Sequence, residues 1–188
     1  MKATMIIIIL LSIITVNVSA QNLGIYTIAS KDTNNEIKAS PIADFYITKS
    51  LSKKFSLSTY LYFSQGWSEA MLYLDYSPKS WMTVSLGAGI EQSKKMFRGT
   101  TCLWLGKKNW SLMNIYELGF GQDNYWYKSQ FNYQVSKTLG VGYLAKRYFG
   151  VGPVLKISVS KDIDLWVSPM HDFEAKQNKL AGGISIKF

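Results

Sequence analysis

Residues 125–135 read YWYKSQFNYQV, and this stretch indicates the fold class. Mostly apolar or aromatic side chains at every second position alternate with mostly polar ones between them. The first set is Tyr125, Tyr127, Ser129, Phe131, Tyr133 and Val135, and the second is Trp126, Lys128, Gln130, Asn132 and Gln134. Successive side chains of a β-strand point to opposite faces, so a period of two indicates a strand with one apolar face.

The same alternation recurs over residues 55–64, 69–76, 81–91, 151–159 and 180–188, with turn-forming residues between most segments. From Gln21 onward no long stretch shows the apolar spacing of an amphipathic helix. We expect about twelve strands of roughly ten residues, the length that a tilted strand needs to cross a bilayer. Ten strands is the alternative, because 42–48, 96–105 and 110–120 alternate least clearly.

The composition narrows the class of protein further. The 188 residues include six Trp, twelve Tyr and nine Phe, and the formal net charge is +9. A mean hydropathy of 0.00 excludes a polytopic helical membrane protein, and this many aromatic residues argues against intrinsic disorder. The single cysteine, Cys102, excludes an intramolecular disulfide, and we interpret it as a small strand residue.

The first twenty residues have the features of a signal peptide. Lys2 precedes an apolar run over 5–16, and Val18-Ser19-Ala20 forms a small-residue cleavage site. The apolar run is too short for a spanning helix. We therefore expect secretion with cleavage after Ala20, which leaves residues 21–188 as one domain.

Alternating strands occur both in soluble sandwiches and in membrane barrels. Aromatic residues beside turns favour the barrel, because such residues form girdles at the membrane interfaces; they are Trp67, Trp81, Trp110, Trp126, Tyr125, Tyr148 and Phe149. If both termini face the periplasm, the longest connection, 170–179, falls on the outer side. A closed barrel also pairs every backbone group, which a bilayer requires.

The chain ends on Phe188, which closes an alternating strand. This end resembles the terminal signature of bacterial outer-membrane β-barrel proteins, in which the barrel assembly machinery reads an aromatic C-terminus. The resemblance implies a single antiparallel up-and-down transmembrane β-barrel in a Gram-negative outer membrane, in contact with its lipids. Two cationic pairs, Lys94/Lys95 and Lys146/Arg147, fall on the outer side in this topology, where they could pair with lipopolysaccharide phosphates.

Charged side chains in the phase opposite to the lipid-facing one point into the lumen of such a barrel. We predict eight pore-lining residues: Glu69, Asp75, Glu91, Arg98, Glu117, Lys128, Lys146 and Lys156. They either line an aqueous path or pair across a plugged interior, since twelve strands lie between filled and open barrels. If the path is open, the basic residues of the later strands favour anionic solutes; these are Lys128, Lys146, Lys156 and Lys187.

Other chemistry finds little support in the sequence. His171 is the only histidine, which argues against a Cys/His metal site, and we expect no cofactor. Outer-membrane lipid hydrolases use His-x-Ser on one strand face, whereas Phe173 holds that position and Ser168 falls on the opposite face. The Gly-x-Gly steps lack the strand–turn–helix context of nucleotide loops. Cationic pairs beside turns in a secreted chain do not indicate nucleic acid.

The sequence therefore predicts an outer-membrane β-barrel that acts as a narrow porin-like channel for passive diffusion of small solutes. It predicts no enzyme. The alternatives are a non-conducting structural or surface-binding barrel and, third, an outer-membrane lipid-modifying hydrolase.

Overall fold

The computed structural model describes residues 20–31, 34–93 and 96–188. The predicted signal peptide and the Lys94/Lys95 pair lie outside the described residues, except for Ala20. In the described part of the chain no helix is long and apolar enough to cross a membrane.

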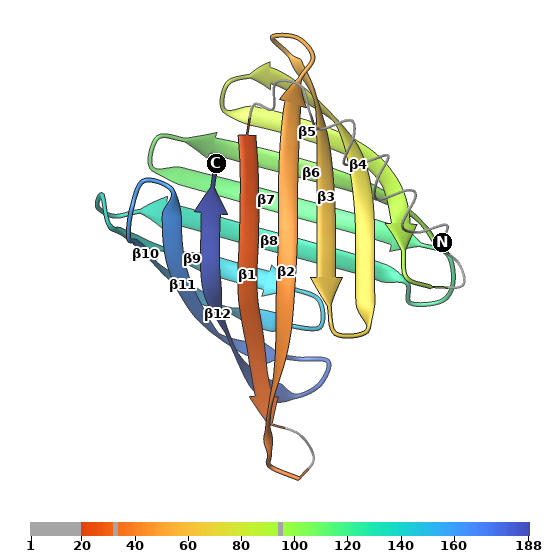
Figure 1. Cartoon of the computed structure of the whole chain (residues 1–188), viewed down its shortest axis with the longest axis vertical. Coiled ribbons are helices and arrows are strands. Elements are labelled where there is room, and N and C mark those ends of the chain that lie inside the picture. The colour runs from red at the N-terminus through yellow and green to blue at the C-terminus, as the bar shows by residue number, and fades with distance from the viewer. Residues whose placement is uncertain (1–19, 32–33, 94–95) are drawn as a thin grey trace.

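The described residues form twelve strands that close into one barrel. They are β1 (Ala20–Lys31), β2 (Ile37–Ser50), β3 (Phe55–Ser64), β4 (Trp67–Lys79), β5 (Met82–Glu91), β6 (Phe97–Lys107), β7 (Trp110–Gly119), β8 (Tyr125–Gln134), β9 (Leu139–Lys146), β10 (Gly150–Ser158), β11 (Ile163–Asp172) and β12 (Gln177–Lys187). Each strand runs antiparallel to its sequence neighbours (Figure 1). The prediction of a single up-and-down barrel of twelve strands is confirmed, and the ten-strand alternative is wrong.

The barrel closes between its first and last strands. β1 and β12 pair in an unbroken antiparallel register from Asn22 opposite Lys187 to Ser30 opposite Lys179. This pairing satisfies the backbone groups that an open sheet would leave at its edges, as hydrocarbon surroundings require. β1 begins and β12 ends at the same end of the barrel, which we call the terminal end. The other end, where β1 leads into β2, is the loop end.

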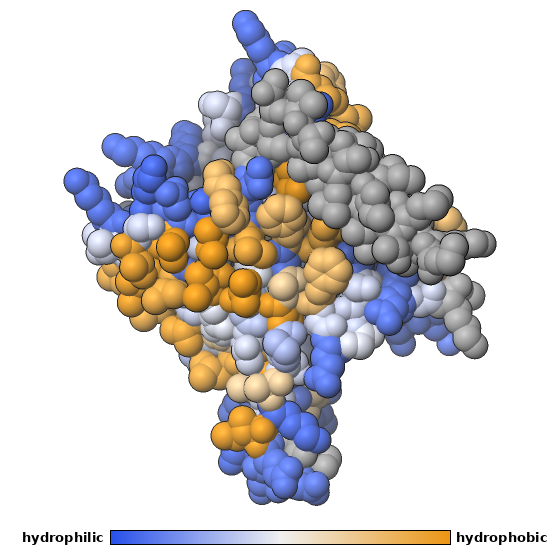
Figure 2. Space-filling view, in the orientation of Figure 1, coloured by the Kyte–Doolittle hydropathy of each residue, from blue (hydrophilic) through white to orange (hydrophobic). Residues whose placement is uncertain are grey.

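The strand faces show which side chains point outward. Along β4 the buried residues Met71 and Tyr73 alternate with Leu72 and Leu74, which are 42% and 50% exposed. In Figure 2 apolar side chains gather across the middle of the visible face, with hydrophilic residues beyond them at both ends. This distribution matches the apolar outer band of an outer-membrane barrel.

The expected long connection over 170–179 is wrong. β11 continues through His171 to Asp172, and only residues 173–176 form the loop. The Asp172 carboxylate accepts hydrogen bonds from the backbone N–H groups of Glu174 and Ala175, at 3.0 and 3.1 Å. Lys176 adopts a positive φ of 51°. This tight polar turn lets the two strands pair to their ends.

The expected aromatic girdle is only partly correct. Trp81 lies in the turn between β4 and β5 and is 41% exposed. Trp67 and Trp126 instead line the interior, together with Phe149. Trp67 and Glu69 are two residues apart on β4, so the strand period places both on the inner face.

Candidate functional site: the barrel lumen

All eight predicted pore-lining residues lie in the barrel interior. A cavity at the loop end is lined by Glu69, Glu91 and Arg98. Glu117 forms an ion pair with Arg98. Asp75 lies nearer the terminal end. Lys128, Lys146 and Lys156 meet at one cavity beside β8, β9 and β10. The alternation therefore identified the inner face correctly, while conduction past these residues stays a prediction.

The loop-end cavity has a volume of about 790 Å³ and opens toward the loops. Its walls combine aromatic rings with charged and amide groups. The rings are Tyr62, Trp67, Phe120, Tyr125, Trp126, Tyr148 and Phe149, and the polar residues include Glu69, Glu91, Arg98 and Asn124. This wall composition is that of a ligand pocket, largely apolar with a few placed polar groups.

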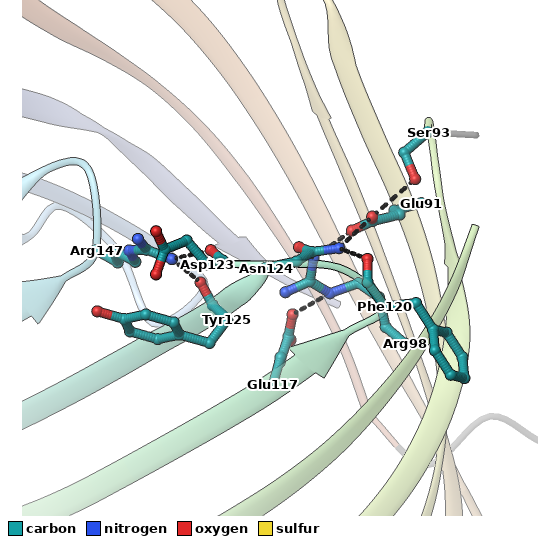
Figure 3. Close-up of polar contacts among 9 residues, drawn as sticks. All are labelled: Glu91, Ser93, Arg98, Glu117, Phe120, Asp123, Asn124, Tyr125 and Arg147. Atoms are coloured by element: carbon teal, nitrogen blue, oxygen red, sulfur yellow. Dashed lines mark hydrogen bonds and ion pairs between the residues drawn. The ribbon is translucent and has the colours of Figure 1, made fainter. Parts of the chain in front are cut away.

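Arg98 is the centre of an ionic network at this cavity (Figure 3). Its Cα partners are Gly89 on β5 and Gly119 on β7, so neither neighbouring strand places a side chain directly beside it. The guanidinium donates a short hydrogen bond to Glu91, and its Nε lies 3.3 Å from Glu117 Oε2. Both carboxylates are almost fully buried. One buried cation therefore compensates two buried anions.

Asn124 ties this network to the loop between β7 and β8. Its side-chain oxygen accepts from Arg98 at 2.9 Å, and its Nδ2 donates to Glu91 Oε1 at 2.9 Å. Ser93 donates to the same Glu91 oxygen at 2.9 Å. The loop is thus held against β5 and β6 by polar contacts inside the lumen.

A layer of side chains crosses the lumen beneath the loop-end cavity. We call it the barrier layer, and it consists of Lys146, Tyr26, Tyr62, Trp126 and Phe149. The Lys146 Nζ lies 3.9 Å from the Phe149 ring centroid, 4.8 Å from that of Tyr62, 5.3 Å from that of Trp126 and 5.5 Å from that of Tyr26. Such distances are those of cation–π contacts.

The ammonium of Lys146 donates a hydrogen bond to the Tyr26 hydroxyl at 3.1 Å. Tyr26 and Asp44 line the same interior cavity. Lys146 is only 4% exposed, and no carboxylate of the described residues forms an ion pair with it. Four aromatic rings and the Tyr26 hydroxyl therefore stabilise this buried charge.

Two adjacent cavities occupy the lumen between the barrier layer and the terminal end. The larger, about 380 Å³, lies along β2–β7, and the smaller, about 290 Å³, lies against β8–β10. They share five lining residues, namely Asn22, Asp44, Trp104, Met113 and Lys128. Among the described residues, Phe149 alone lines both the smaller of them and the loop-end cavity.

Several charged interior residues escaped the sequence analysis. Asp44 lies on β2, one of the segments whose alternation is least clear. Asp164 on β11 pairs with Lys187 at 2.9 Å and Lys156 at 3.7 Å, and Asp172 pairs with Lys179 at 2.6 Å. Alternation along β11 and β12 would have placed the residues of these pairs on the inner face.

The interior charges divide into two walls. β2–β7 carry mainly acids, with Arg98 as the exception, whereas β8–β10 carry only lysines among their charged inner residues. Because Lys156 and Lys187 share Asp164, two of the four lysines expected to favour anions already have a carboxylate partner. The lumen thus has an acidic and a basic side rather than uniform positive charge.

Arg147 lies at the loop end, where the sequence placed it, but its side chain is buried. Its guanidinium donates to the backbone oxygens of Asp123 and Tyr125, at 2.7 and 2.5 Å, and lies 3.7 Å from the Tyr125 ring centroid (Figure 3). It is 7% exposed, and Lys146 is 4% exposed. Lumen and loop contacts bury both side chains, while a contact of the barrel with lipopolysaccharide stays a prediction.

His171 lies on the outer face of β11 near the loop end. Its Nδ1 is 2.8 Å from Oδ1 of Asn178, the residue opposite it on β12. Phe173, at the position of the hydroxyl in His-x-Ser, packs its ring edge-on against the imidazole at 4.7 Å. Ser168 is fully buried on the inner face. The His-x-Ser position therefore holds no hydroxyl, and the Ser168 hydroxyl lies on the opposite face from His171.

No group of three or more His, Cys, Asp or Glu side chains in the described part of the chain is arranged to hold a metal ion. Cys102 lies on the inner face of β6 and lines the larger terminal-end cavity.

No protein-family model matches the sequence, and no curated protein matches it. Among solved structures, the KdgM porin is 14% identical over 89% of this chain and 99% of its own, with a TM-score of 0.61. The NanC porin is 9% identical over 90% and 100%, with a TM-score of 0.58. Outer membrane phospholipase A from Escherichia coli is 13% identical over 88% and 95%, with a TM-score of 0.58. The chain thus shares the fold of 12-strand outer-membrane β-barrels.

Proposed function

We propose that the protein is a narrow outer-membrane channel through which small solutes diffuse passively. The observation that carries this proposal is the arrangement of the lumen. One cavity approaches from the loop end and two from the terminal end, and a single layer of side chains separates them. Both compartments are lined by charged and hydrogen-bonding groups, which suit hydrated solutes.

The shared fold supports a membrane barrel without deciding its activity. Two of the similar structures are porins, and one structure of KdgM is a complex with oligogalacturonate. Another is a phospholipase. The choice between these activities therefore depends on the side chains of this chain, which place opposed acidic and basic walls across the lumen.

The purified chain, reconstituted in a planar lipid bilayer, is expected to give discrete current steps. They should be smaller than those of open porins with 16–18 strands, because the barrier layer narrows the lumen. The measurement is single-channel recording in symmetrical potassium chloride. The control is a preparation that has been heat-unfolded, for which gel migration shows the loss of the folded barrel.

A second candidate is a non-conducting barrel with a structural or surface-binding role. The burial of Lys146 and its four ring contacts favours it, because these side chains fill the lumen in this conformation. Bilayers that contain correctly folded protein but never conduct would establish this candidate and contradict the channel.

A lipid hydrolase is the remaining alternative, and we expect no hydrolase activity. Replacing His171 by alanine should leave phospholipid hydrolysis at background, because Phe173 takes the place of the nucleophile beside His171. Fluorogenic phospholipid in mixed micelles with calcium provides the assay, with the unchanged chain beside the variant. Hydrolysis by the unchanged chain that H171A abolishes would contradict this expectation.

Insertion into the outer membrane involves two further expected partners. The outward side chains contact membrane lipid, and the barrel assembly machinery recognises Phe188. The Phe188 side chain is well placed for this, because the residue is 70% exposed while its backbone N–H is held by Gln21 at 3.1 Å.

A further inference from the structure

The 290 Å³ cavity beside β8, β9 and β10 differs in charge from the rest of the lumen, and we call it the basic cavity. Lys128, Lys146 and Lys156 line it, and Asp44 is the one carboxylate of the described residues that does so. Gln130 and Asn132 add amide donors from β8. Three cations against one anion leave the cavity with an excess of positive charge.

The strand register forces two of these cations together. Lys128 on β8 and Lys146 on β9 are directly opposite partners, and both side chains face the cavity. Like charges directly opposite each other on antiparallel strands destabilise the pair. Lys128 has no ion pair with a carboxylate of the described residues, and the same holds for Lys146.

Existing contacts compensate these charges only in part. Lys146 donates to the neutral Tyr26 hydroxyl at 3.1 Å, and Lys156 lies 3.7 Å from an Asp164 oxygen that Lys187 approaches more closely. A buried charge without an adjacent partner is costly. The cavity therefore offers positive charge that a bound anion would neutralise.

We propose that the basic cavity binds a small oxyanion, a phosphate or a short-chain carboxylate, between Lys128 and Lys146. Charge-assisted hydrogen bonds from two ammonium groups suit such oxygens. The volume lies at the low end of ligand sites, which run from about 300 to 1,000 Å³, so the ligand is small. The inference deepens the proposed channel, since it names the solute class held within its lumen.

Binding is tested by isothermal titration calorimetry of the folded full chain in detergent micelles. Sodium phosphate and sodium succinate are the two probes, and succinamide is the uncharged counterpart of succinate. Heat from phosphate alone identifies a phosphate site, and heat from succinate alone identifies a carboxylate site. Either result supports the proposal. The proposal is overturned if neither anion binds, or if succinamide binds as tightly as succinate.

Variants then locate the site. Lys128→Met and Lys146→Met are each expected to weaken binding by about tenfold or more, the loss of a charged hydrogen bond, and Lys128→Arg should retain it. Lys161→Met is the matched control, because its side chain is 91% exposed in the turn between β10 and β11. Unchanged affinity in Lys128→Met and Lys146→Met would contradict the assignment.

Two features keep this test decisive. Lys128 is only half-buried, so Lys128→Met carries the test if Lys146→Met fails to fold. Calorimetry needs no ion flow, so the site and the channel can fail separately. Conductance without anion binding would overturn the site alone, and anion binding without conductance would overturn the channel alone.

Discussion

Replacing Arg98 by methionine is expected to lower the free energy of unfolding by about 3–5 kcal/mol, the cost of breaking a buried ion pair by removing one partner. The substitution leaves Glu91 and Glu117 buried, at 5% and 1% exposure, without their cation. Asn124 and Ser93 still donate to Glu91, but two neutral donors cannot replace the charge of the guanidinium. The measurement is urea unfolding of the barrel, with tryptophan fluorescence as the signal that reports the folded fraction.

Two further variants isolate the cause of this loss. Glu117→Gln removes one carboxylate and leaves the contact between Arg98 and Glu91 intact, so its effect should be about 1 kcal/mol. Lys161→Met removes an equal charge from an exposed ion pair, 3.8 Å from Asp162, and should change stability by about 0.5 kcal/mol or less. A loss in Arg98→Met no larger than that in Lys161→Met would contradict the buried-network interpretation.

The strand phase was predictable because it depends on one strand at a time. Alternation within residues 125–135 placed Lys128 inside, and alternation within β4 did the same for Glu69 and Asp75. The same rule also places Trp67 and Trp126 inside, although their positions beside turns suggested a girdle. Nearness to a turn tells where a residue lies along the barrel axis. Its place in the two-residue alternation decides whether it faces the lumen or the lipid.

The contacts between strands were not predictable, because they depend on register. Arg98 meets Glu91 and Glu117 only because Gly89 and Gly119 are its direct partners on the adjacent strands. A register shifted by one residue would turn those faces outward. Loop geometry fixes the register, and the loops also escaped prediction: Asp172 closes a four-residue turn where the polar sequence suggested a longer loop.

The inward fold of the turn between β9 and β10 had no signal in the sequence either. Tyr148 takes a left-handed conformation, with a φ of 67°, and the Phe149 N–H donates to the Lys146 oxygen at 3.1 Å. This turn directs the Phe149 ring toward the Lys146 ammonium instead of toward lipid. A residue expected at the membrane interface thus becomes part of the barrier layer.

Replacing Phe149 by alanine is expected to raise the single-channel conductance severalfold. Phe149 is the described residue that lines both the loop-end cavity and the basic cavity, so removal of its ring joins the two. Lys146 also loses its nearest ring, at 3.9 Å, and its ammonium becomes accessible to water. The measurement is recording in planar bilayers, beside the unchanged chain at the same salt concentration.

Tyr148→Ala is the matched control for this variant. Its ring belongs to the same turn but is 54% exposed and, of the cavities described, lines the loop-end one alone. Alanine carries the same β-carbon as tyrosine, so the cost of the left-handed backbone is unchanged. Its conductance should therefore equal that of the unchanged chain. Loss of a buried phenyl ring costs about 3–5 kcal/mol, so heat-modifiable gel migration must first show that Phe149→Ala is folded. If Phe149→Ala is folded and its conductance is unaltered, the barrier layer does not limit the current. This result would contradict the assignment of the conducting path to the barrier layer.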